Sequence, residues 1–208
     1  MSTIPGSATP GVPPADALPV PGTAFGGPFV PSPAAGGTRD ALVRAGRGLA
    51  VGAELRAELD ALYADYAAAL DDRRYDDWIE LFVDDCRYLL QPRENFERGL
   101  PLATLAFESK GMLRDRVYGV TRTLFHAPYT QRHLVGPLRV TALGADGAVD
   151  VQASYAVYRT KVQDRTEVFN VGQYLDRVVR EPDGRMRFAV KRAIFDSETI
   201  PNSIIHPI

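Results

Sequence analysis

The sequence has few of the side chains that hold redox metals. Its 208 residues include a single cysteine, Cys86, and three histidines, His126, His133 and His206. One thiol excludes an intramolecular disulfide, and it excludes any iron–sulfur cluster that takes two or more thiolates from this chain. Because no disulfide framework is available, we expect the protein to work in the reducing cytoplasm.

Long apolar runs and an excess of one charge sign are also missing. No window approaches the roughly 18 consecutive apolar residues that cross a bilayer, and no Lys or Arg precedes Arg39, which argues against a secretory signal. The 24 basic and 26 acidic residues leave a net charge of −2, whereas nucleic-acid binding normally needs a basic face. The sequence therefore predicts neither a membrane nor a nucleic-acid partner.

The first 38 residues are almost uncharged and rich in helix-breaking residues. They contain 9 of the 16 prolines and 7 of the 18 glycines, and Asp16 is their only charged residue. Ordering such a stretch costs about 1–2 kcal/mol per residue, more than its few apolar side chains can offset. We therefore predict a disordered Pro/Gly-rich extension over residues 1–50, with a partner-binding arm as the alternative, and a folded domain over residues 51–208.

The folded part opens with helical periodicity. Five residues recur every three or four positions and share one face of a helix predicted over residues 54–71, namely Leu55, Leu59, Leu62, Tyr66 and Leu70. A short second helix follows, for which Asp76 and Asp77 are N-cap candidates. A first strand is then predicted at residues 84–90, and a third helix at residues 107–122, with Phe107 on its apolar face.

From residue 131 the pattern changes to alternation, which indicates strands. Four are predicted, over residues 131–143, 148–161, 166–180 and 185–196. In the last one, alternation places Phe188 on the apolar face and Lys191 with Arg187 on the polar face. Helices followed by an antiparallel meander are typical of an α+β domain.

The end of the sequence is apolar. Residues 200–208 contain four isoleucines, too many to be left in water. The segment either folds back on its own sheet or forms part of a subunit interface. The strand at 166–180 carries apolar residues on both faces, so we expect the face not covered by helices to be an interface.

No catalytic motif stands out. The phrases GxSxG and GxxxxGK are absent, and Cys86 on its strand is typical of a small buried hydrophobe. Pro128 breaks the helix that would align His126 with His133 for a two-His, one-carboxylate iron site. The Asp pairs at 71–72, 76–77 and 84–85 are typical of helix ends and turns.

Tyrosines offer the one possible pocket chemistry. Together with His133, some of them can line a space between helices and sheet and polarise a carbonyl, as in small isomerases and dehydratases; these are Tyr66, Tyr88, Tyr155, Tyr158 and Tyr174. Tyrosines with satisfied hydroxyls are equally ordinary core and interface residues. The spacing does not choose between the two uses.

Several phrases together resemble the small (beta) subunits of aromatic-ring-hydroxylating dioxygenases. They include LDDRRYDDWIELFVDDCRYLL, ESKGMLRDRVYGV, HAPYTQRHLVG and EVFNVGQYLD, and the resemblance covers about residues 54–208. Within that family, PRENFERGLPL and PNSIIHPI resemble most the small oxygenase subunit of salicylate 5-hydroxylase.

The resemblance implies a cone-shaped α+β fold like that of nuclear transport factor 2 and ketosteroid isomerase, with N-terminal helices packed on a curved, mostly antiparallel sheet. It implies assembly of three large (alpha) and three small subunits. The large subunit would hold the Rieske [2Fe–2S] cluster and the mononuclear Fe(II). These centres would receive electrons from NAD(P)H through a reductase and a ferredoxin. This chain would be structural, without catalytic, cofactor-binding or metal-binding residues, in an oxygenase that acts on a salicylate-like aromatic acid in aromatic compound catabolism.

We predict that eight residues contact neighbouring subunits or stabilise the contact: Arg74, Trp78, Tyr118, Arg122, Arg132, Ile204, Ile205 and Ile208. Two other functions stay open from the residues alone. One is a stand-alone isomerase or dehydratase of the same fold with a Tyr/acid/His pocket, and the other is a small-molecule binding protein.

Overall fold

The computed structural model describes residues 48–200 and 203–208. Their helices are α2 (Ala53–Asp71), α3 (Tyr75–Glu80), α4 (Arg93–Glu97), α5 (Lys110–Tyr118) and the short π-helix η3 (Gly119–Thr123) that continues α5. Their strands are β1 (Phe82–Pro92), β2 (Leu105–Phe107), β3 (Tyr129–Val135), β4 (Arg139–Leu143), β5 (Val149–Lys161), β6 (Glu167–Arg180) and β7 (Met186–Phe195). The predicted extension over residues 1–50 lies, up to residue 47, outside the described residues.

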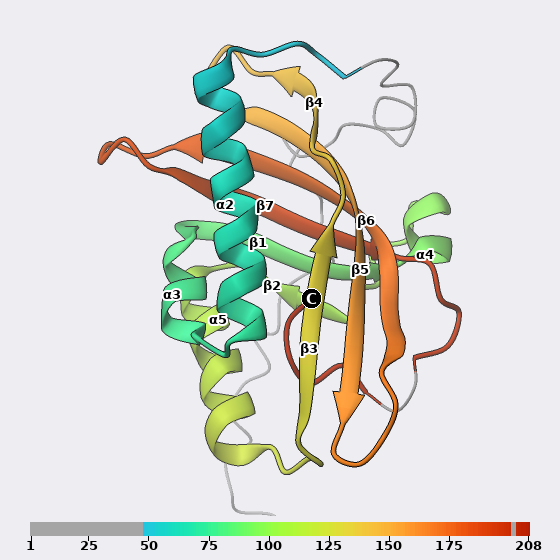
Figure 1. Ribbon diagram of the computed structural model, residues 1–208. Helices are drawn as coiled ribbons and strands as arrows, with labels where there is room; N and C mark the ends of the chain where they lie inside the picture. The colour runs from blue at the N-terminus through green and yellow to red at the C-terminus, as the bar shows by residue number, and fades with distance from the viewer. Residues whose placement is uncertain (1–47, 201–202) are drawn as a thin grey trace, which may run out of the picture. The chain divides into compact units, whose positions relative to one another are not determined.

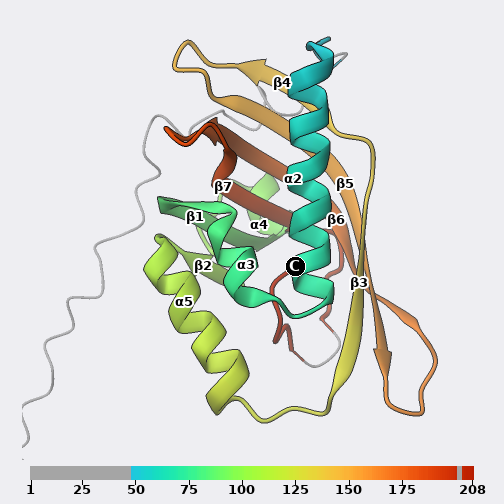
Figure 2. The same cartoon turned by 60° about the vertical axis from the view of Figure 1, so that its left-hand side comes forward.

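The strands form one mixed sheet that curves around the helices. Its order is β2-β1-β7-β6-β5-β3, and β4 pairs with β5 beyond the end of β3. Every pairing is antiparallel except that of β1 with β7. Figures 1 and 2 show α2, α3 and α5 on one side of this sheet and α4 on the other. The predicted α+β class, with helices packed on a curved and mostly antiparallel sheet, is confirmed.

The longest helix, α2, is held by one apolar face. It begins one residue before the predicted start and ends at the predicted Asp71. Leu59, Leu62, Tyr66 and Leu70 of the predicted face are at most 5% exposed. Burying a large apolar side chain contributes about 1.5–3 kcal/mol, so packing against the sheet, more than helix propensity, stabilises α2.

The start of α3 differs from the prediction. The helix begins at Tyr75 with Arg74 as its N-cap residue, so Asp76 and Asp77 lie in the first turn instead of capping it. Negative charge in the first turn still stabilises the helix, because it lies near the positive end of the helix dipole. Asp77 also accepts a hydrogen bond from Arg74, Nη1 to Oδ2, at 2.5 Å.

Two further boundaries were predicted wrongly. Phe107 belongs to β2, where it pairs with Tyr88, and the third helix begins only after Ser109, whose hydroxyl caps it by accepting from the Met112 amide. The strand predicted over 131–143 is two strands, β3 and β4, because the chain leaves the ladder at residues 136–138 around a proline that has no N–H to donate.

A bulge in β7 overturns the predicted placement of Lys191. Phe188 pairs with Val178 and Val190 with Arg177, so β7 carries one more residue than β6 at this point. A one-residue shift moves the following side chains to the opposite face. Lys191 is therefore fully buried beside the core instead of exposed with Arg187.

Candidate functional site

A buried ion pair lies at the centre of the interior. The Nζ of Lys191 lies 2.8 Å from the Oδ2 of Asp176, and both side chains have no exposed surface. Asp176 also accepts hydrogen bonds from the Tyr63 hydroxyl at 2.5 Å and the Arg192 amide at 3.0 Å. The ammonium group lies 3.1 Å from the centre of the Tyr174 ring. The pair is thus enclosed by hydrogen bonds and aromatic faces.

Burial sets the protonation of this centre. Loss of water lowers the pKa of Lys191 to about 8, partly offset by the Asp176 charge. The same loss of water raises the pKa of Asp176, and it raises the pKa of Tyr63 and of Tyr174 well above the ordinary value. Both tyrosine hydroxyls are therefore neutral. The Tyr63 hydroxyl donates to Asp176, whereas the Tyr174 hydroxyl is buried without a hydrogen-bond partner.

A second buried pair joins the end of α2 to β3. The Nδ1 of His133 lies 2.6 Å from Asp71, and the His133 main-chain amide donates to the same carboxylate at 3.1 Å. Arg132 approaches this carboxylate from outside at 3.7 Å. The remaining ring nitrogen of His133, Nε2, is buried without a hydrogen-bond partner. An aspartate that orients a histidine is the arrangement of a general base, and it also fastens a helix to a strand.

The C-terminal segment, residues 203–208, is held in the interior by side chains. The Tyr66 and Tyr88 hydroxyls donate to the main-chain oxygen of Ile208 at 2.5 and 2.9 Å. Arg116 donates to the main-chain oxygens of Ile204 and Ile205 at 3.0 and 2.6 Å. Of the two alternatives for this segment, the structure has the one in which it folds back on its own chain.

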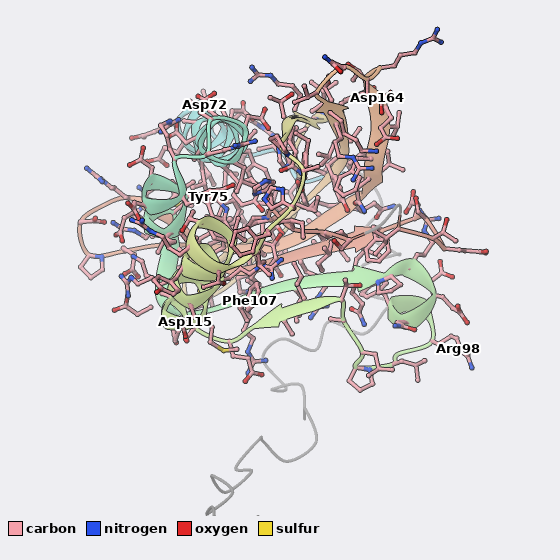
Figure 3. The ribbon with its side chains drawn as sticks, turned by 90° about the horizontal axis from the view of Figure 1, so that it is seen from below. Asp72, Tyr75, Arg98, Phe107, Asp115 and Asp164 are labelled. Atoms are coloured by element: carbon pink, nitrogen blue, oxygen red, sulfur yellow. The ribbon has the colours of Figure 1, made fainter. Side chains whose placement is uncertain are left out.

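His206 anchors the middle of the C-terminal segment. Its Nδ1 lies 2.6 Å from the Tyr75 hydroxyl, and its ring stacks on the Tyr75 ring with the centroids 6.0 Å apart. Figure 3 looks at the domain from below and labels Tyr75 on α3, close to α5, which carries the labelled Asp115. Burial lowers the pKa of His206 to about 4, assisted by the charge of Arg73. The histidine is thus neutral near pH 7.

Four of the five tyrosines predicted to line a pocket do meet in the interior. Tyr66, Tyr88, Tyr155 and Tyr174 are at most 4% exposed. Tyr155 stacks on Tyr174 with ring centroids 4.2 Å apart. Tyr158 is only half-buried and pairs across the ladder with Arg132, whose side chain is 71% exposed.

Sequence reasoning missed Asp176, Lys191, Tyr63 and Arg116. Asp176 and Lys191 come together through the β6–β7 register, and no sequence pattern next to either residue indicates that they form a buried pair. Only the position of Tyr63, one residue from Leu62 on the apolar face of α2, could have indicated burial.

Residues 66–202 match the family model described as the ring hydroxylating beta subunit. The match spans the end of α2, all the strands and both buried pairs. The chain belongs to this family.

Individual relatives agree with the family. This beta subunit is 34% identical over 151 residues to the anthranilate 1,2-dioxygenase small subunit of Burkholderia cepacia, covering 73% of this chain and 92% of that protein. It is 35% identical, with a TM-score of 0.67, to the crystal structure of a beta subunit assigned to an aromatic-ring-hydroxylating dioxygenase of Novosphingobium aromaticivorans, covering 74% of this chain and 97% of that one. A structure assigned as a scytalone dehydratase from the same species shares the fold, with a TM-score of 0.54 at 18% identity, over 74% of this chain and 93% of that one. The predicted likeness to the nuclear transport factor 2 fold class is confirmed.

The eight predicted interface residues of this beta subunit fall into two groups. Trp78, Ile204 and Ile208 are at most 6% exposed and belong to the chain's own core, with Ile205 half-buried beside them. The other four are exposed: Arg74, Tyr118, Arg122 and Arg132.

Exposed apolar groups gather next to two of these four. Tyr118 at the end of α5 is 64% exposed, Leu124 is 42% exposed and Phe125 is 100% exposed. We call residues 118–125 the α5–η3 segment. Figure 2 shows it at the same end of the domain as the connection between α2 and α3, which contains Arg74.

Metal ligands do not cluster in the part of the beta subunit that the structure describes. Within residues 48–200 and 203–208, no three His, Cys, Asp or Glu side chains are placed to share an ion. Burial raises the pKa of the Cys86 thiol to about 11, so this cysteine stays protonated and is a poor ligand. None of the described helices has the length and apolar character of a membrane span.

Proposed function

We propose that this chain is the structural small subunit of the terminal oxygenase component of an aromatic-ring hydroxylase, and that a large subunit carries the chemistry. The family match over residues 66–202 carries the proposal. The interior supports it, because several of the polar groups that could act on a substrate are engaged within the chain. Lys191 is bound to Asp176, and Tyr66 and Tyr88 are bound to Ile208.

The redox cofactors of such an oxygenase do not fit this chain. A Rieske centre takes two cysteines and two histidines, and the sequence has one cysteine. We therefore assign the Rieske [2Fe–2S] cluster and the mononuclear Fe(II) to the large subunit, with electrons from NAD(P)H through a reductase and a ferredoxin.

The proposed substrate is a salicylate-like aromatic acid. The anthranilate 1,2-dioxygenase relative supports this class, since anthranilate and salicylate are both benzoates with a small polar group in the ortho position. The phrase PRENFERGLPL, which forms α4 and the loop after it, supports the salicylate assignment. The ring position that is hydroxylated would be set at the iron of the large subunit.

Assembly into three large and three small subunits is part of the proposal, with the cytoplasm as its location. A ring of subunits about a threefold axis needs two different patches on each subunit. Arg74, Arg122 and Arg132, together with the apolar α5–η3 segment, offer exposed groups for one of them. The combination of aromatic residues and arginines is enriched in protein interfaces.

Co-expression with a large subunit tests the function. We expect the chain alone to be colourless, free of iron and inactive. We expect the purified complex to contain iron and sulfide and to hydroxylate salicylate when a reductase, a ferredoxin and NAD(P)H are supplied. Benzoate and anthranilate serve as comparison substrates. Stoichiometric iron in the isolated chain, or turnover of an aromatic compound by it, contradicts the proposal.

One observation favours a second candidate, a dehydratase or isomerase. The Asp71–His133 pair has a free ring nitrogen in an interior rich in tyrosines. Turnover by the isolated chain that disappears in His133→Gln would support this function over the structural one.

A further inference from the structure

The C-terminal segment is bound in the way that a protein binds a ligand. Residues 203–208 belong to no helix or strand, and side chains from four separate elements hold them. Tyr66 comes from α2, Tyr75 from α3, Tyr88 from β1 and Arg116 from α5. Three of these four side chains contact main-chain atoms of the segment, so the contacts recognise hydrogen-bond acceptors instead of particular side chains.

The innermost contact is a built acceptor site. The main-chain oxygen of Ile208 lies between the Tyr66 and Tyr88 hydroxyls, and the Tyr88 hydroxyl accepts from the Ile208 amide at 2.8 Å. Both tyrosines and Ile208 have no exposed surface. Two convergent donors on one buried oxygen are what a carbonyl or carboxylate oxygen of a small molecule requires.

The walls around this oxygen are aromatic. The Trp78 ring lies 5.8 Å from the Tyr88 ring and 6.4 Å from the Tyr66 ring, measured between centroids. Trp78 Nε1 is buried without a hydrogen-bond partner, and so is the Nε of Arg116. Buried polar groups without partners are rare in proteins. Their presence shows that the C-terminal segment does not satisfy all the polar groups around it.

The charge of the surroundings favours an anion. Arg116 and Lys191 bring two positive charges to the residues around the segment, and Asp176 neutralises that of Lys191. No carboxylate contacts Arg116 among the contacts of the described residues. An acceptor with a negative charge would therefore bind better than a neutral one.

We propose that the space now filled by Ile204–Ile208 is a binding site for a small aromatic carboxylic acid, closed by the C-terminal segment. The carboxylate would take the place of the Ile208 main-chain oxygen between Tyr66 and Tyr88, and the ring would take the place of the Ile208 side chain in the hydrophobic core to which Trp78 also belongs. The segment and the acid compete for the same donors. This inference does not rest on the proposed function.

Loosening the segment in the full-length chain tests the site. Ile208→Ala removes the buried side chain, and Ile205→Ala is the matched control, because Ile205 is only half-buried and its main-chain contact to Arg116 is kept. Trp78, the only tryptophan of the sequence, reports binding by its fluorescence. We expect benzoate to bind Ile208→Ala at least tenfold more tightly than wild type or Ile205→Ala.

Two further variants identify the donors. Adding Tyr66→Phe to Ile208→Ala removes one hydroxyl and should weaken benzoate binding about tenfold, whereas adding Tyr158→Phe, outside the interior, should leave it unchanged. Toluene, which lacks the carboxylate, should bind more weakly than benzoate.

A peptide measurement keeps the test independent of any one variant. Added Ser203–Ile208 peptide should reverse the benzoate response of Ile208→Ala. If Ile208→Ala does not fold, the same benzoate titration is carried out on Ile204→Ala and is judged by the same criteria. A folded variant with no saturable benzoate response, or a response unchanged by Tyr66→Phe, overturns the proposal.

Discussion

Lys191 and Asp176 form a buried ion pair in which each charge is stabilised by the presence of the other. Their atoms are 2.8 Å apart in a region with no exposed surface. Removing one partner of a buried pair typically costs about 3–5 kcal/mol, whereas replacing both by apolar groups is often neutral.

We therefore predict that Lys191→Met lowers the free energy of unfolding by about 3–5 kcal/mol and that Lys191→Met/Asp176→Leu recovers most of the loss. Urea unfolding of the two variants and the wild type measures both values. A loss below about 1 kcal/mol for the single variant would contradict the role given to the pair.

His206 makes the fold sensitive to acid. Its pKa is about 4 in the folded chain and has an ordinary value near 6.5 in the unfolded chain. Between these values the unfolded chain binds more protons, so stability is complete above pH 6.5 and falls as the pH drops toward 4. The shift corresponds to at most about 3 kcal/mol. The test compares the unfolding free energies of wild type and His206→Gln at pH 7 and at pH 4.5. We expect the unfolding free energy to fall less between these two pH values in the variant than in wild type. Equal decreases would contradict the role given to His206.

At the scale of the elements, the sequence predicted what depends on local periodicity. The bounds of α2 are within one residue of those predicted because its apolar face repeats with the helical period. The π-helix and the bulge in β7 have no such local signal. The bulge is decided by pairing with β6, and its consequence, the burial of Lys191, was missed for that reason.

Gly172 is a place where strand pairing leaves no room for a side chain. A Cβ atom there would lie 1.9 Å from the Ile194 main-chain oxygen and 2.8 Å from the Phe195 Cα. Both neighbours are backbone atoms of β7, so the clash can be relieved only by moving the strand.

We predict that Gly172→Ala lowers the free energy of unfolding by at least about 3 kcal/mol. Gly119→Ala is the matched control, because its Cβ would meet only the Thr123 hydroxyl at 3.9 Å in a helical backbone. Denaturant unfolding compares the two variants. A similar small effect in both would show that β6 and β7 can separate at little cost.

At the scale of the whole molecule, the sequence predicted the family and the fold class, and it predicted the candidate site only in part. Four of five pocket tyrosines lie in the interior, but their partners, Asp176, Lys191 and the C-terminal segment, come together only through long-range packing. The interface residues stay a prediction. Trp78 and Ile208 are buried in the chain's own core, so their part would be to stabilise the contact from within, whereas Tyr118 is exposed and could touch a neighbour directly.

The α5–η3 segment gives the remaining interface prediction its sharpest test. Phe125 is 100% exposed and Tyr118 is 64% exposed, so changing either leaves the core of the small subunit untouched. Aromatic anchors that become buried in an interface commonly cost 2 kcal/mol or more, about thirtyfold in affinity, when they are removed. We predict that Phe125→Asp weakens association with the large subunit at least thirtyfold, while the unfolding transition of the isolated chain stays within about 0.5 kcal/mol of wild type.

Leu102→Asp provides the matched control for this variant. Leu102 is 67% exposed and follows α4, which lies on the other side of the sheet from α5. Co-purification of tagged small subunit with the large subunit, followed by titration of the two purified subunits, measures the effect. Loss of association in Phe125→Asp but not in Leu102→Asp places the large subunit on the α5–η3 segment. The reverse result would place the large subunit on the α4 side of the sheet.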